Sequence, residues 1–242
     1  MNSQSVERMD ISHSQEHLQI ALHRLRYDFV LARLRANQSV LEIGTGLGFF
    51  TAELFPRCAS YVGVEYDARA CAESRSKNQG AEIVQADARQ LPFEESRFSF
   101  IVCLEVIEHL GDWQAGVRNI HRCLQPDGTA IISIPWRRRG GKSKINPFHL
   151  YEPGEKEMVS LLERLFVNVE TNYLYFEETF WMRLCRRCHL RRLFGLAKIY
   201  ADLSAGLPYA TARLRIGRHP QGKRDGLIVT VSGKKTPCQS RA

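Results

Sequence analysis

The chain has 242 residues, of which 44% are hydrophobic and 25% are charged, and its formal net charge is +8. This length suits one sizeable α/β domain, and the composition is that of an ordinary globular protein. No apolar stretch reaches the roughly 20 residues of a membrane span, and residues 1–16 lack the apolar core of a secretory signal. We therefore expect a cytoplasmic protein, a setting that also suits seven scattered cysteines.

Amphipathic helices and short apolar strands alternate along the chain. The predicted helices cover 16–35, 49–55, 68–78, 114–123 and 153–166. The predicted strands cover 39–43, 61–64, 82–85, 98–104, 129–134, 167–175 and 226–232. This order predicts an α/β fold, a Rossmann-like doubly wound sheet of seven strands that is mostly parallel and carries helices on both faces.

The first predicted strand runs through Glu42 into a glycine-rich turn, Gly44-Thr45-Gly46-Leu47-Gly48. Glycine accepts positive φ and has no Cβ, so the backbone of such a turn can approach a nucleotide-like ligand closely. One residue is missing relative to the dinucleotide-binding pattern G-x-G-x-x-G, and the acid would repel a pyrophosphate. The turn therefore predicts a cationic or hydroxyl-rich ligand.

Acidic residues end or follow four of the predicted parallel strands, and they are Glu42, Glu65, Asp87 and Glu105. The carboxyl ends of parallel strands meet at one edge of the sheet, and ligands of doubly wound folds bind beyond that edge. We expect the four acids to gather there, beside the glycine turn.

The turn and these acids, in this order over about residues 39–135, resemble the class I methyltransferases that use S-adenosylmethionine (SAM). The closest motifs are those of the ubiquinone-pathway O-methyltransferase-like group. The resemblance implies SAM as the cofactor, with Glu65 on the ribose hydroxyls and Asp87 at the adenine. The cofactor-binding residues that it implies are Glu42, Gly44, Thr45, Gly46, Glu65, Tyr66, Asp87, Ala88, Leu104 and Glu105.

The segment from Glu105 through Glu108 to His109 follows the fourth strand, and one helical turn would place these three side chains on one face. With His149 they are candidate ligands of Mg²⁺ or Mn²⁺. The segment also resembles the small-RNA terminal 2′-O-methyltransferases, and in both resembled groups this pattern implies a metal that binds the acceptor hydroxyls. The competing interpretation needs no metal. There, His109 or His149 is the catalytic residue that takes the acceptor proton as a general base.

The positive charge is concentrated in residues 176–224, which hold eleven of the 34 Lys and Arg but three of the 26 Asp and Glu. We expect a basic helical insertion or lid there. It interrupts the SAM-binding core, which consists of residues 37–175 and 225–234 and follows an N-terminal helical cap at 1–36. Residues 180–203 read as an amphipathic helix capable of peripheral membrane contact. These features favour an anionic or lipid-like acceptor.

The sequence thus predicts one methyltransferase domain, 1–242, that O-methylates a small aromatic, lipid-like or natural-product acceptor. An RNA 2′-O-methyltransferase is the alternative, although no appended nucleic-acid module is visible in the sequence. A non-catalytic SAM-binding protein is a second alternative. The oligomeric state stays open.

Overall fold

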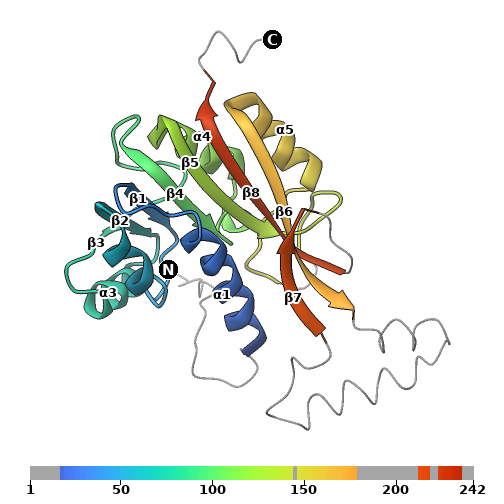
Figure 1. Ribbon diagram of the computed structural model, residues 1–242, viewed down its shortest axis with the longest axis horizontal. Coiled ribbons are helices and arrows are strands. Elements are labelled where there is room, and N and C mark those ends of the chain that lie inside the picture. The colour runs from blue at the N-terminus through green and yellow to red at the C-terminus, as the bar shows by residue number, and fades with distance from the viewer. Residues whose placement is uncertain (1–16, 144–145, 179–211, 219–222, 236–242) are drawn as a thin grey trace, which may run out of the picture.

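One eight-stranded sheet organises the molecule (Figure 1). The computed structural model describes residues 17–143, 146–178, 212–218 and 223–235. The strands are β1 (Ser39–Ile43), β2 (Ser60–Glu65), β3 (Glu82–Gln85), β4 (Phe98–Leu104), β5 (Leu124–Pro135), β6 (Phe166–Glu178), β7 (Ala212–Gly217) and β8 (Lys223–Lys234). The helices are α1 (His17–Leu31), α2 (Thr51–Leu54), α3 (Ala68–Lys77), α4 (Trp113–Cys123) and α5 (Glu155–Leu165), with 3-10 turns η2 (Phe55–Arg57) and η3 (Ile107–His109).

The strand order is β3-β2-β1-β4-β5-β8-β6-β7. The first five strands in this order pair in parallel, whereas β8 runs antiparallel to both of its neighbours, β5 and β6. The predicted Rossmann-like, mostly parallel sheet is therefore confirmed. In this topology the carboxyl ends of β1 to β5 lie at the same edge as the carboxyl end of β6.

The expectation of seven strands is wrong, because β7 forms an eighth. It lies inside the segment predicted to be a helical insertion and pairs antiparallel with the extended end of β6, from Glu178 opposite Ala212 to Tyr173 opposite Gly217. Its sequence, ARLRIG, alternates apolar and basic residues, which suits an edge strand. The two ends of the predicted insertion, 176–178 and 223–224, belong to β6 and β8, and the helix expected at 180–203 lies outside the described residues.

Each face of the sheet carries its own apolar layer, as a doubly wound fold requires. Side chains of α4 and α5 pack with Leu41, Ile101 and other residues of one strand face. Side chains of α1, α2 and α3 pack with Val40 and Phe100 on the opposite face. Successive residues of β1 and β4 thus point to opposite layers, and this alternation fixes the register of both strands.

Local sequence explains where the flanking helices begin. Asp67 and Asp112 accept hydrogen bonds from the backbone amides of Ala70 (2.8 Å) and Ala115 (2.9 Å), so each caps the helix that follows it. Such caps contribute about 1 kcal/mol each. No helix within the described ranges combines the length and the apolar character needed to cross a membrane.

Candidate active site

The glycine turn adopts the positive-φ backbone that its glycines allow. Gly44, Gly46 and Gly48 have φ of 81°, 54° and 77°, a region that favours glycine. A Cβ on Gly44 would lie 2.3 Å from Cγ2 of Val106, and one on Gly48 would collide with Asn78. A Cβ on Gly46 would meet nothing within 4 Å. The outer two glycines are therefore required for packing, whereas Gly46 faces open space that a ligand can enter.

Glu65 ends β2 and is joined to this turn. Its carboxylate accepts hydrogen bonds from the backbone amides of Gly46 and Asp67, both at 2.9 Å. Each oxygen has one such partner, so the carboxylate retains capacity to accept from hydroxyl groups of a ligand. The next residue, Tyr66, is 63% exposed, so its ring is available to a planar group at this edge.

The residues predicted to hold adenine lie on the short segment after β3. Asp87 is half-buried and pairs with the guanidinium of Arg89. Hydrogen bonds from Arg89 outweigh the effect of burial and hold the pKa of the Asp87 carboxyl below its ordinary value. Ala88 is buried in the core. The Asp87 carboxylate is therefore ionised at neutral pH and is an acceptor suited to an amino group.

Glu42, at the end of β1, is buried in a hydrogen-bond network of its own. It is 1% exposed and accepts hydrogen bonds from the hydroxyls of Tyr27, Tyr61 and Thr51. Burial raises the pKa of this carboxyl, and the three hydroxyl donors oppose that shift. The network fastens α1 and α2 to the end of β1, so Glu42 is placed to position the glycine turn.

The carboxyl end of β4 carries a second acid in an unusual conformation. Glu105 has φ of 56°, and its carboxylate accepts from Ser133 Oγ (2.8 Å) and pairs with Arg26 Nη2 (3.0 Å). Arg26 belongs to α1 and is 3% exposed. This buried ion pair ties α1 to the edge of the sheet beside Leu104, the other residue predicted to border the methionine end of SAM.

Glu108, His109 and His149 come together immediately beyond Glu105. One potential ligand atom from each lies within 4.8 Å of the others, and the two imidazole rings meet edge to face at 4.8 Å. Nδ1 of His109 lies 3.2 Å from the carbonyl oxygen of Phe148, so the loop bearing His149 is fastened to η3. The structure therefore groups three of the four candidate metal ligands, while Glu105 turns towards Arg26.

The carboxylate of Glu108 is the exceptional group of this cluster. It is fully buried, and neither oxygen has a hydrogen-bond partner among the described residues. Burial and the nearby charge of Glu105 raise the pKa of Glu108 well above its usual value. Leaving a buried polar group without a hydrogen-bond partner costs roughly 1–3 kcal/mol, and leaving a buried charged group without one costs more. Ionisation of Glu108 at this site therefore requires a cation or a hydrogen-bond donor.

Sequence reasoning missed two residues of this edge, Arg26 and Glu152. Glu152 is buried, binds His149 Nδ1 at 2.6 Å and pairs with Arg137. Burial would raise the pKa of Glu152, but hydrogen bonds from Arg137, His149 and Ser143 hold it below its ordinary value. The position of Glu152 three residues after His149 is a weak sequence signal for their contact. No local pattern distinguishes Arg26 from the other arginines of α1.

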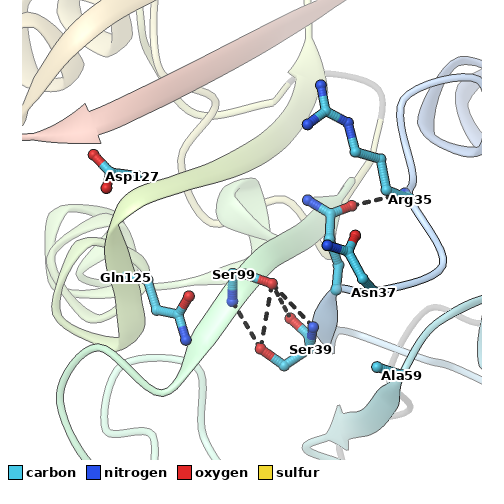
Figure 2. Close-up of a pocket in the computed structure, with 8 residues that line it drawn as sticks. Arg35, Asn37, Ser39, Ala59, Ser99, Gln125 and Asp127 are labelled. Atoms are coloured by element: carbon cyan, nitrogen blue, oxygen red, sulfur yellow. Dashed lines mark hydrogen bonds between the residues drawn. The ribbon is translucent and has the colours of Figure 1, made fainter.

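A polar pocket, drawn in Figure 2, lies at the edge of the sheet where β1 and β4 begin. Ser39 and Ser99, near the starts of β1 and β4, line it and hydrogen-bond to each other. Arg35 and Asp127 stand at its rim and are exposed. Because ligands of doubly wound sheets bind at the carboxyl edge, this pocket is separate from the candidate active site.

Comparisons with known proteins find methyltransferases. Residues 41–132 match a family described as the methyltransferase domain. A probable S-adenosylmethionine-dependent methyltransferase of Mycobacterium tuberculosis is 34% identical over 143 residues, 58% of this chain and 52% of that protein. A similarly named protein of Mycolicibacterium smegmatis is 30% identical over 151 residues, 60% of this chain and 59% of its own. The chain thus spans little more than half the length of these relatives.

Solved structures share the fold at low sequence identity. The YcgJ protein of Bacillus subtilis has a TM-score of 0.59 at 17% identity and covers 88% of this chain and 99% of its own. The N-methyltransferase NodS of Bradyrhizobium japonicum, solved with S-adenosylhomocysteine, has a TM-score of 0.54 at 17% identity and covers 93% and 90%. The architecture is therefore the Rossmann-like methyltransferase fold.

Proposed function

We propose that the protein is a SAM-dependent methyltransferase that methylates a hydroxyl oxygen of a small-molecule acceptor. The match over residues 41–132 and the named relatives support the reaction class. One structural observation supports the arrangement: Val106, at the start of the Glu108 cluster, lies against Gly44 of the glycine turn. A cofactor on the turn and an acceptor at the cluster would then be neighbours, as group transfer requires.

The residues of the turn suit the adenosine and methionine parts of SAM. Glu65 would accept from the ribose hydroxyls while its bonds to Gly46 and Asp67 keep it in place. The open space at Gly46 admits the amino-acid end of the cofactor beside Leu104 and Glu105. The adenine would lie between Tyr66 and the segment of Asp87 and Ala88. We propose that Glu42 acts indirectly, through the position of the turn.

Methyl transfer needs alignment and a deprotonated acceptor. SAM supplies an electrophilic methyl group on a sulfonium. The acceptor oxygen forms the new carbon–oxygen bond as the carbon–sulfur bond breaks, and the hydroxyl proton must leave. His109 or His149 could receive that proton as a general base, since the neutral ring of each carries a lone pair on one nitrogen.

The same cluster also fits a divalent cation, Mg²⁺ or Mn²⁺. Glu108, His109 and His149 supply one carboxylate and two imidazoles, and the buried Glu108 oxygens have an unmet need for a positive partner. A bound cation would lower the pKa of the acceptor hydroxyl. The orphaned carboxylate favours this arrangement over a histidine base that acts alone. The resemblance to the ubiquinone-pathway O-methyltransferase-like group rests on this same segment, from Glu105 to His109.

The test follows release of S-adenosylhomocysteine from SAM over a panel of phenolic and lipid-like alcohols. We expect turnover with at least one acceptor, and a loss of about 100-fold or more in His149→Ala and His109→Ala. Activity that chelation abolishes and Mg²⁺ or Mn²⁺ restores supports the cation. Activity that resists chelation but needs a histidine supports the general base. Near-normal turnover in both variants would contradict the proposed role of the cluster.

A further inference from the structure

The loop that carries His149 also carries an acid outside every predicted motif. The side chain of Glu152 is 4% exposed, and its Oε1 lies 2.6 Å from Nδ1 of His149. An ionised carboxylate can accept but not donate, so Nδ1 carries the hydrogen in this pair. The lone pair of the neutral ring is therefore on Nε2.

A contact of Asn146 on the other side of the ring indicates the same tautomer. Oδ1 of Asn146 accepts from the backbone amide of Phe148 at 3.0 Å, which directs the amide nitrogen Nδ2 towards His149. Nδ2 lies 2.9 Å from Nε2 of His149, and an amide nitrogen can only donate. Two neighbours on opposite sides thus require Nε2 to be the accepting nitrogen.

Glu152 is itself held by the fold. Its Oε2 accepts from Nε of Arg137, and its backbone pairs with that of Gly141 through two hydrogen bonds of 2.9 and 3.0 Å. These bonds leave the carboxylate little freedom to turn away from His149. Arg137 and His149 therefore both donate to Glu152, one to each oxygen of its carboxylate.

We infer that Glu152 is a positioning residue: it fixes His149 in the Nδ1–H tautomer, so that the Nε2 lone pair, which accepts from Asn146 in this structure, serves the cluster with Glu108 and His109 once a cation displaces that donor. The inference rests on the proposed function, because it needs that cluster to bind a cation. A carboxylate behind a metal-binding histidine orients the ring and raises its basicity, and its loss typically weakens metal binding by about 10- to 100-fold.

The test compares two acids of the same region in the full chain. Glu152→Gln removes the charge behind His149. Glu157→Gln is the matched control, because Glu157 accepts from Gly154 N (3.0 Å) and the hydroxyl of Tyr151 and supports the same loop. Affinity for Mn²⁺ alone is measured by electron paramagnetic resonance, with S-adenosylhomocysteine affinity as the check on folding.

We expect Glu152→Gln to weaken Mn²⁺ binding about 10- to 100-fold and Glu157→Gln to change it less than about twofold, with cofactor affinity retained in both. Equal Mn²⁺ binding by wild type and Glu152→Gln, or an equal loss in both variants, would overturn the inference. Glu108→Gln separates the two levels. If it leaves Mn²⁺ binding unchanged, the cation site of the proposed function fails and the inference fails with it.

A measurement on the unsubstituted protein covers the case in which Glu152→Gln does not fold. Nitrogen-15 resonances of histidine rings distinguish the two neutral tautomers. We expect metal-free His149 to be protonated on Nδ1. A ring protonated on Nε2, with a bare Nδ1 beside Glu152, would overturn the inference whatever the variants do.

Discussion

Buried polar side chains separate into satisfied and unsatisfied groups, and the difference is informative residue by residue. Glu42 accepts hydrogen bonds from three hydroxyl groups, so its carboxylate is satisfied within the fold. Glu108 is equally buried and has no such donors among the described residues. Since buried carboxylates in native proteins are normally partnered, the second pattern supports the ligand that we propose at the Glu108 cluster.

His121 allows a pH prediction at the same scale. It lies on α4 against the ring of Phe166, and its Nε2 is buried without a hydrogen-bond partner in the described structure. Burial, followed by the nearby charge of Lys234, lowers the pKa of His121. The unfolded chain therefore binds a proton at His121 more readily than the folded chain, so this group reduces stability as pH falls through about 6.5.

We expect the free energy of unfolding to fall between pH 7.5 and 5.5 by up to about 1.4 kcal/mol per pH unit from His121. His121→Gln removes this proton site, so its stability should change less over that interval. Urea unfolding of both proteins at the two pH values measures the difference. Equal pH dependence in the two proteins would contradict the assignment.

At the scale of elements, α1 packs on the sheet and also makes specific polar contacts with residues of the candidate site. Tyr27 of α1 binds Glu42 below the glycine turn, and Arg26 binds Glu105 at the end of β4. These contacts reach two strand ends from adjacent positions of one helix. The helix is therefore placed to hold both halves of the cofactor edge at once.

Breaking the Arg26–Glu105 pair should destabilise the protein strongly, because the Glu105 carboxylate, only 17% exposed, loses its charged partner. We expect Arg26→Met to lower the free energy of unfolding by about 3 kcal/mol, and Arg26→Met with Glu105→Gln to recover at least half of that loss. Arg24→Met, which breaks exposed pairs with Asp28 and Glu53 on the same helix, should cost less than about 1 kcal/mol. Equal losses for Arg24 and Arg26 would contradict this.

Most elements were predictable because their signals are local. The bounds of β3 and β4 match the predicted strands 82–85 and 98–104, and acidic caps mark α3 and α4. β7 was not predictable in the same way, since its short basic pattern gains strand structure only by pairing with β6. Propensity alone does not reveal such long-range pairing.

The site was predictable to the extent that it follows strand ends. The glycine turn, Glu65 and Asp87 lie where the topology requires. The partners that decide their chemistry, such as Arg26 on Glu105 and Glu152 on His149, come from other elements or from a folded loop. Their contacts depend on tertiary geometry that the order of residues does not display.

At the scale of the whole molecule, one edge of the sheet concentrates the functional features. The glycine turn, the buried ion pair of Glu105 and the Glu108 cluster lie there, and β6 ends at the same edge. The start of β7 lies at this edge too, because Ala212 pairs with Glu178 at the end of β6. We propose that the acceptor is bound here, and contact of residues 180–203 with a membrane stays a prediction.

The central claim is that this edge binds SAM through the glycine turn. Gly46 provides the sharpest probe, because its φ is 54° and an added Cβ would enter open space. Gly80 is the matched control. Its φ is 93°, and an added Cβ would make an ordinary 3.5 Å contact with Phe55, away from the turn. Alanine at either position should carry a similar backbone cost of about 1 to 2 kcal/mol.

Isothermal titration calorimetry with S-adenosylhomocysteine tests the claim. We predict one binding site in the wild-type protein, an affinity at least about tenfold weaker in Gly46→Ala, and unchanged affinity in Gly80→Ala. Absence of binding by the folded wild-type protein, or wild-type affinity in Gly46→Ala, would contradict it.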